Sequence, residues 1–270
     1  MTAPARPDPR PLLGVGLKVV STLVFTAMVA CVKLSAADVP TGEIVFFRSF
    51  FALLPILAVL AVRGELRGVL ATRHLGSHIW RGAVGVTSMY FWFYGIGLLP
   101  LAEAMAIGYA SPLVIVVLAA LVLGERIGVW RIAAVVGGFI GILVILSPHS
   151  IDTGQSGATE LVGALATLTS AFLAALAMIF VRRLTATETT ASIVVYFSAT
   201  ATAGALLSVP FGWMVPPPGV LAVLVLAGIL GGVGQILMTE SYRHAEASVI
   251  ATFEYTSMVW SLLFAMLLFD

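Results

Sequence analysis

Long apolar runs separated by short polar segments dominate this sequence. Two of them, Trp80–Leu98 and Leu101–Leu123, follow each other with almost no connection, and the second ends at Gly124-Glu125-Arg126. About 20 helical residues, each rising ~1.5 Å, cover the ~30 Å hydrocarbon core of a bilayer. We therefore predict that these two runs form a membrane hairpin of helices, with aromatic and polar residues along its middle.

The same pattern predicts nine spanning helices along the chain. They are Leu12–Leu34, Glu43–Val62, Trp80–Leu98, Leu101–Leu123, Arg131–Ser147, Thr159–Val181, Thr189–Val209, Gly219–Thr239 and Ser248–Phe269. In the fifth of them, Gly137-x-x-x-Gly141 has the spacing that lets a neighbouring helix approach closely.

The expected fold is all-α, with a tail, two helical units and a linker. Residues 1–11 form an N-terminal tail, and residues 12–147 form the first unit of five spanning helices. Residues 148–158, rich in polar and helix-breaking types, form the predicted linker. Residues 159–270 form a second unit of four spanning helices.

Composition indicates a polytopic membrane protein. Hydrophobic residues make up 60% of the chain and charged residues only 10%, whereas soluble domains are about a quarter charged. The balance of 14 basic and 13 acidic residues argues against nucleic acid as a partner. The single cysteine and the spacing of the four histidines predict no metal site, and without a phosphate-binding loop we expect no cofactor and no use of ATP.

The positions of the basic residues predict the orientation. Eleven of the 14 are counted with the connections on the N-terminal side, including Arg81 and Arg131, which stand at the starts of their predicted spans. This bias places the N-terminus in the cytoplasm, in a multi-pass protein of a bacterial inner membrane. The other three, Lys18, Lys33 and Arg48, lie inside predicted spans.

A weak internal repeat relates the two units. Aligning Glu125 with Asp270 sets Ala110–Leu113 against Tyr255–Met258, so that two apolar helices match in their polar-aromatic centres and acidic ends. Because five spans is an odd number, the second unit should lie upside down relative to the first. Inverted repeats with a binding site between them are common in secondary transporters.

Four short motifs carry a family resemblance. They are Phe46-Phe47-Arg48, Gly95-x-Gly97-Leu98-Leu99-Pro100-Leu101, Ala106-Ile107-Gly108-Tyr109-Ala110-Ser111-Pro112-Leu113 and Leu123-Gly124-Glu125-Arg126. With them the chain resembles the drug/metabolite transporter superfamily in its EamA-type branch, over nearly its whole length. It is most similar to the bacterial subgroup that includes riboflavin and S-adenosylmethionine uptake proteins.

The resemblance implies a ten-helix secondary transporter of a small organic metabolite, not an enzyme, with both termini cytoplasmic. The tenth helix of the family, the counterpart of Arg131–Ser147, has no match before Asp270, so we expect an incomplete second unit. Two other classes stay open: a membrane-embedded enzyme acting on lipid or isoprenoid substrates, and a passive channel or assembly subunit. The enzyme would need acidic or histidine residues clustered at one interface, whereas the acids here are scattered.

Charges inside spans are the first candidates for a functional site, since each costs about 2.5–3.5 kcal/mol at a helix centre. Arg48 either faces a central cavity and binds a polar or anionic substrate group, or pairs with Glu43 or Asp38 at the outer surface. Glu254 is a candidate proton carrier if transport uses protons, or else makes a structural hydrogen bond. Lys33 is expected to extend to the membrane surface.

Aromatic and polar residues complete the predicted substrate site. Its members are Tyr90, Tyr94, Tyr109, Ser111, Gln235 and Tyr255, alongside Arg48. Tyr90 and Tyr94 have an aromatic face that can stack on a planar heterocycle, although contact with lipid is the simpler alternative. Pro112 cannot donate a hydrogen bond to the Gly108 carbonyl, so it is expected to bend its helix. Glu125 is expected to cap a helix or form a local pair at the cytoplasmic face.

Overall fold

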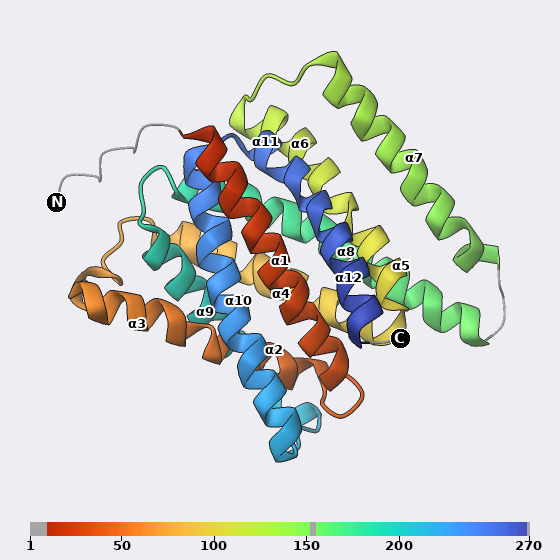
Figure 1. Cartoon of the computed structure of the whole chain (residues 1–270), viewed down its shortest axis with the longest axis horizontal. Coiled ribbons are helices and arrows are strands. Elements are labelled where there is room, and N and C mark those ends of the chain that lie inside the picture. The colour runs from red at the N-terminus through yellow and green to blue at the C-terminus, as the bar shows by residue number, and fades with distance from the viewer. Residues whose placement is uncertain (1–9, 152–154, 269–270) are drawn as a thin grey trace.

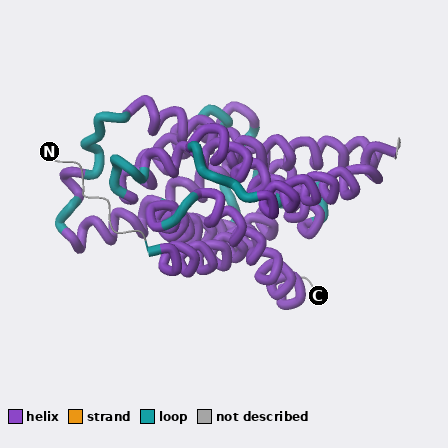
Figure 2. The backbone as a smooth tube through the Cα atoms, turned by 90° about the horizontal axis from the view of Figure 1, so that it is seen from above, coloured by secondary structure: helices purple, strands orange, loops and turns teal. Residues whose placement is uncertain are grey.

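The protein is helical throughout the part described by the computed structural model, residues 10–151 and 155–268. Figures 1 and 2 show helices joined by short loops, with no strand among the described residues. The α-helices are α1 (Pro11–Ser35), α2 (Thr41–Phe51), α3 (Leu53–Arg63), α4 (Leu75–Leu98), α5 (Leu101–Gly108), α6 (Ala110–Leu123), α7 (Val129–Ile151), α8 (Gln155–Leu184), α9 (Thr190–Leu206), α10 (Pro218–His244), α11 (Ala247–Thr252) and α12 (Thr256–Leu268). Three short 3-10 helices are η1 (Leu66–Gly68), η2 (Val209–Phe211) and η3 (Phe253–Tyr255).

Many of these helices are long and apolar enough to cross a membrane. Within the described residues, six stretches meet that requirement: Pro11–Ser35, Thr41–Val62, Glu103–Leu123, Gly157–Leu184, Pro218–His244 and Ala247–Phe264. Val129–Val144 and Thr190–Leu206 are shorter apolar helices. The prediction of an all-α polytopic membrane protein is confirmed, while the number of nine spans and their inverted arrangement stay predictions.

One predicted boundary is wrong. Helix α4 begins at Leu75 and not at Trp80, so Arg81, which was counted with the preceding connection, lies well inside the helix and not at its start. Its side chain is only 2% exposed. The stretch 148–158 was expected to be non-helical but is largely helical, because α7 continues to Ile151 and α8 begins at Gln155, while 152–154 lie outside the described residues. Its role as a linker between two units stays a prediction. Polar composition suggested a loop, but helix formation is governed by the neighbouring turns as well.

Three of the predicted spans are interrupted inside the bundle. The second breaks at Ala52, three residues before Pro55, whose nitrogen cannot donate to a preceding carbonyl. The fourth breaks at Tyr109, where α5 ends at Gly108 and α6 begins at Ala110, shortly before Pro112. The last contains the 3-10 turn η3, which holds Glu254 between α11 and α12. Such interruptions leave backbone groups and side chains free to face an internal site.

Helices from the first part of the chain pack against helices from the second part. Helix α1 packs along α10 and α4 packs along α8, and these are the most extensive contacts in the protein (Figure 1). Small residues allow the close approach. The hydroxyl of Ser21 donates to the Gly234 carbonyl at 3.1 Å, and the hydroxyls of Ser88 and Ser170 each bond to the other residue's carbonyl, at 2.9 and 2.8 Å.

Helix α7 lies at the edge of the bundle and presents much apolar surface (Figure 1). The expectation for its glycine motif is wrong. A Cβ added at Gly137 or Gly141 would meet nothing within 4 Å, whereas one at Gly138 would come within 2.6 Å of the Leu113 side chain. The close helix contact is therefore made by the next position, because the packed face of α7 is turned by one residue.

Two charged side chains cap helices from a distance. The ammonium group of Lys33 donates to the carbonyls of Ile96 at 2.7 Å and Leu99 at 3.1 Å, at the C-terminal end of α4, which replaces the predicted extension to the membrane surface. The carboxylate of Glu125 accepts from the backbone nitrogens of Ala247 and Ser248, at 2.9 and 3.0 Å. Glu125 thus caps the N-terminus of α11, which is distant in the sequence, and not a helix next to it in the chain.

Candidate functional site

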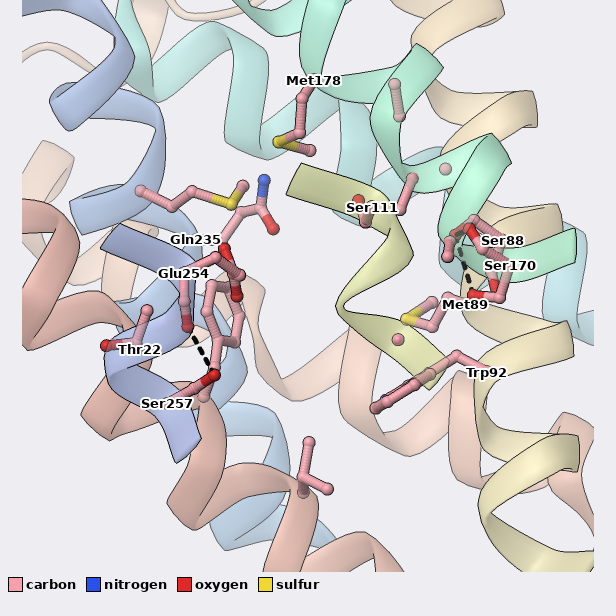
Figure 3. A pocket seen from close by; sticks show the side chains of 18 of the residues that line it. Thr22, Ser88, Met89, Trp92, Ser111, Ser170, Met178, Gln235, Glu254 and Ser257 are labelled. Carbon is pink, nitrogen blue, oxygen red and sulfur yellow. Dashed lines mark hydrogen bonds between the residues drawn. The ribbon is translucent and has the colours of Figure 1, made fainter. Parts of the chain in front are cut away.

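A cavity of about 260 Å³ lies between α1, α4, α8, α10 and the broken helices. Thr22, Gln235, Glu254 and Ser257 occupy one side of it, and Ser88, Met89, Trp92 and Ser170 occupy the other (Figure 3). Five methionines and four aromatic residues contribute apolar walls: Met28, Met89, Met105, Met178, Met238, Phe25, Trp92, Phe93 and Phe197. Methionine side chains adapt their shape readily, so these walls suit a ligand with an apolar body.

One face of α4 supplies the wall on its side of the cavity. Arg81, Gly85, Ser88, Met89 and Trp92 all line it, with the three- and four-residue spacing of a single helical stripe. The phenolic side chains of Tyr90 and Tyr94 fall on the other side of the same helix, where they are 42% and 41% exposed. Neither belongs to the cavity lining.

A partly buried ion pair lies on the opposite side. The ammonium group of Lys18 on α1 contacts the carboxylate of Glu254 in η3, at short hydrogen-bond distance. The side chain of Lys18 is 2% exposed, while that of Glu254 is 36% exposed and lines the cavity. The Tyr242 ring lies 5.9 Å from the Lys18 nitrogen and adds a cation–π contact. The pair thus places a neutralised carboxylate where a cavity ligand or a proton can reach it.

Two of the three interrupted spans, α5–α6 and α11–α12, meet through their aromatic residues. The rings of Tyr109 and Tyr255 lie 5.2 Å apart, and the Tyr109 and Ser257 hydroxyls are 3.2 Å apart. Tyr109 lines the cavity. Tyr255 packs against the Tyr109 ring but is not part of the cavity lining, and it is 38% exposed. Nearby, the hydroxyls of Thr22 and Thr256 are 2.8 Å apart and tie α1 to α12.

Arg48 lines this cavity. The predicted role of Arg48 in binding substrate required that position. Its side chain is 3% exposed, and no described carboxylate lies within ion-pair distance of it. The alternative partner Glu43 accepts instead from the backbone nitrogen of Met214, at 3.1 Å. The amide nitrogen of Gln235, also buried in the cavity wall, has no hydrogen-bond partner in the described part of the chain.

The structure therefore brings together most of the predicted site residues. Arg48, Tyr109, Ser111, Gln235 and Glu254 line one cavity, while Pro112 is buried in the first turn of α6 behind it. Sequence reasoning missed Lys18 and Arg81. Lys18 was visible as a charge within a span. Arg81 was counted with the connection before α4, because the start of that helix was placed five residues too late and Arg81 then stood at its very end.

A second, wider cavity of about 1200 Å³ lies among the ends of α1, α6, α8 and α10. Its charged lining contains Glu125, Arg126, Arg182, Arg183, Arg243, His244 and Glu246. Four arginines against two carboxylates give this region an excess of positive charge on the side of the bundle where the described chain begins.

A helical membrane bundle that encloses a small cavity between interrupted helices has the architecture of a membrane transporter. Comparison with known proteins agrees with that class. The sequence profile of the EamA-like transporter family matches residues 12–147 and 161–270. The chain therefore belongs to the EamA-like transporter family, as its motifs predicted.

Relatives with named functions include both exporters and uptake proteins. The pseudopaline exporter CntI of Pseudomonas aeruginosa is 33% identical over 255 residues, which cover 92% of this chain and 84% of the exporter. A riboflavin transporter of Rhizobium johnstonii is 30% identical over 80% of this chain and 68% of its own. An S-adenosylmethionine uptake transporter of Rickettsia bellii is 27% identical over 96% of this chain and 86% of its own. A solved crystal structure shares the fold, with a TM-score of 0.69 at 22% identity, over 96% of this chain and 88% of that one.

Proposed function

We propose that this protein is a secondary transporter that moves a small organic metabolite across the bacterial inner membrane by alternating access. The observation that carries the proposal is the cavity beside the place where the interrupted spans α5–α6 and α11–α12 meet. The substrate would bind there, in contact with Arg48, Tyr109, Ser111 and Gln235. Tyr90 and Tyr94, which lie outside the cavity, have no part in the proposed site.

Support for an inverted repeat comes from the positions of the helix breaks. The alignment of Glu125 with Asp270 also sets Tyr109 against Glu254, and both residues lie where a spanning helix is interrupted. The same alignment pairs α1 with α8 and α4 with α10. Under this alignment the α1–α10 contact corresponds to the α8–α4 contact, and these are the two most extensive helix contacts described. A pseudo-twofold relation between 12–147 and 159–270 accounts for both observations.

The proposed orientation has the N-terminus in the cytoplasm. With Arg81 assigned to the cavity, ten of the 11 basic residues counted on the N-terminal side still support it. The wide arginine-lined cavity then opens toward the cytoplasm. Lipid surrounds the bundle, consistent with its exposed apolar side chains.

Glu254 is the proposed proton carrier. Its carboxylate lines the cavity and is held by Lys18, so protonation would release Lys18 and loosen α1 from η3. A transporter can use such an exchange to couple a proton to the movement of its helices.

Counterflow in proteoliposomes tests the proposal. Vesicles would be loaded with riboflavin, S-adenosylmethionine, an amino acid mixture or a dicarboxylate mixture. Each would then be diluted into buffer that contains the same compound in labelled form, with and without a protonophore. We expect saturable accumulation of one compound, and we expect Arg48→Ala and Glu254→Gln to reduce it while the protein is still inserted. Tyr90→Phe, outside the cavity, is the matched control and should transport normally.

Each alternative class gives a different result in this assay. Flux that never saturates and shows no counterflow would indicate a channel, and chemical conversion of the probe would indicate an enzyme. Normal transport by both Arg48→Ala and Glu254→Gln would remove these two residues from the site.

A further inference from the structure

Two buried arginines face the same cavity without a counter-charge. Arg48 comes from α2 and Arg81 from α4, and their side chains are 3% and 2% exposed. The Nε and Nη1 atoms of both make no hydrogen bond within the described chain. Both guanidinium carbons lie over the ring of Phe197 on α9, at 5.7 Å for Arg48 and 3.5 Å for Arg81. Two cations thus meet at one aromatic side chain.

The backbone around these arginines leaves room for them. A Cβ at Gly85 would stand 2.9 Å from Nη1 of Arg81 and 2.9 Å from the Phe197 ring. A Cβ at Gly231 would stand 2.8 Å from Nε of Arg48. Any larger residue at either glycine would push a guanidinium group aside, so the surrounding helices fit both groups closely.

The described part of the cavity has no acid to balance these charges. Glu254 is the one carboxylate in its lining, and Lys18 already neutralises it. Burial of an unpaired charge is unfavourable, and a pair of like charges is more so. An arginine that has lost its water and has no partner is typical of a site whose partner is the ligand.

We propose that the substrate is a small organic dianion, whose two carboxylate groups are bound by Arg48 and Arg81 and whose apolar body lies against the methionine and aromatic walls. This inference rests on the proposed transport function and specifies its substrate class. Guanidinium groups bind carboxylates through paired hydrogen bonds, and the two charges match the two arginines. The wide, arginine-lined cavity toward the start of the described chain would attract the same ligands.

Binding to the purified full chain in detergent tests the charge of the ligand. The probes are the dicarboxylates malonate through suberate and phthalate, the monocarboxylate benzoate, the neutral phthalamide, the cation 1,4-diaminobutane, and inorganic phosphate. Thermal unfolding reports binding, and so does the change in tryptophan fluorescence, to which Trp92 in the cavity lining contributes. We expect at least one dicarboxylate to stabilise the protein, with no effect of the amide or the diamine.

Arg48→Gln and Arg81→Gln remove one charge each and keep much of the side-chain volume. Each should weaken dicarboxylate binding about tenfold to a hundredfold, as expected for loss of a charged hydrogen bond. Arg73→Gln, on the exposed connection before α4, is the matched control and should bind as the unaltered protein does. Without ligand, both variants should unfold at or above the temperature of the unaltered protein, because an unbalanced buried charge is lost.

Several results would overturn the inference. A lower unfolding temperature of both variants without ligand would show that the arginines serve the fold. Preference for phosphate, for the neutral amide or for the diamine would exclude a dicarboxylate. Counterflow of a neutral or cationic compound that persists in both variants would overturn the dianion and leave the transport function standing. Dicarboxylate binding that depends on both arginines, without counterflow of any probe, would support the anion site and overturn the transport function.

Discussion

Glu254→Gln is expected to destabilise this protein more than Lys18→Met does, although both changes break the same ion pair. The two partners differ in their access to water. The Lys18 side chain is 2% exposed, whereas that of Glu254 is 36% exposed toward the cavity. Loss of the carboxylate leaves a buried ammonium group with no counter-charge among the described residues, and the Tyr242 ring lies 5.9 Å from it. Loss of the ammonium group leaves a carboxylate that water can reach.

The size of the effect follows from this difference. Removing one partner of a fully buried pair costs about 3–5 kcal/mol. Because Glu254 is partly hydrated, we discount that value and expect about 1–3 kcal/mol for Glu254→Gln. Lys18→Met should cost about 1 kcal/mol or less, since it also adds apolar contact in α1. The double variant contains no unbalanced charge and should return to within about 1 kcal/mol of the unaltered protein.

Thermal unfolding of the four proteins in one detergent measures this cycle. A loss of 1 kcal/mol corresponds to a shift of about 2–4 °C in a chain of this size. The reasoning is refuted if Glu254→Gln unfolds at the temperature of the unaltered protein, or if the effects of the two single changes add in the double variant.

Three further predictions concern the helix contacts, and unfolding measured in the same detergent checks each. Gly232→Ala should cost more than about 2 kcal/mol, because its Cβ would stand 2.4 Å from the Ala52 carbonyl oxygen. The control Gly97→Ala meets no atom within 4 Å and should be neutral, so equal effects of the two changes would contradict this packing. Glu125→Ala should cost about 1–2 kcal/mol, since two backbone N–H groups at the start of α11 lose their acceptor, and Glu125→Gln should cost less. Lys33→Met should cost about 0.3–1 kcal/mol through loss of the cation at the end of α4, and an unchanged unfolding temperature would exclude that capping role.

The helices and their location in a membrane could be predicted from the sequence, because both depend on local properties of the chain. A run of about 20 apolar residues matches the thickness of a bilayer, and a helix satisfies its own backbone hydrogen bonds. The starts of α1, α5 and α10 therefore lie within one residue of their predicted positions. The helix that contains Arg81 and His78 near its start was predicted too short, because polar residues that are buried by tertiary contacts look like a connection in the sequence.

The face of each helix that lines the cavity was decided by the tertiary structure. In α4, Tyr90 and Tyr94 were predicted to line the site, yet both are exposed, and Trp92 from the same helix lines the cavity. Lipid is as apolar as a protein interior, so hydrophobic patterning does not distinguish an inward face from an outward one. The pairing of Lys18 with Glu254 and the meeting of Arg48 with Arg81 join residues that are far apart in the chain. Which charges balance and which stay unbalanced depends on those distances, and only the packed helices set them.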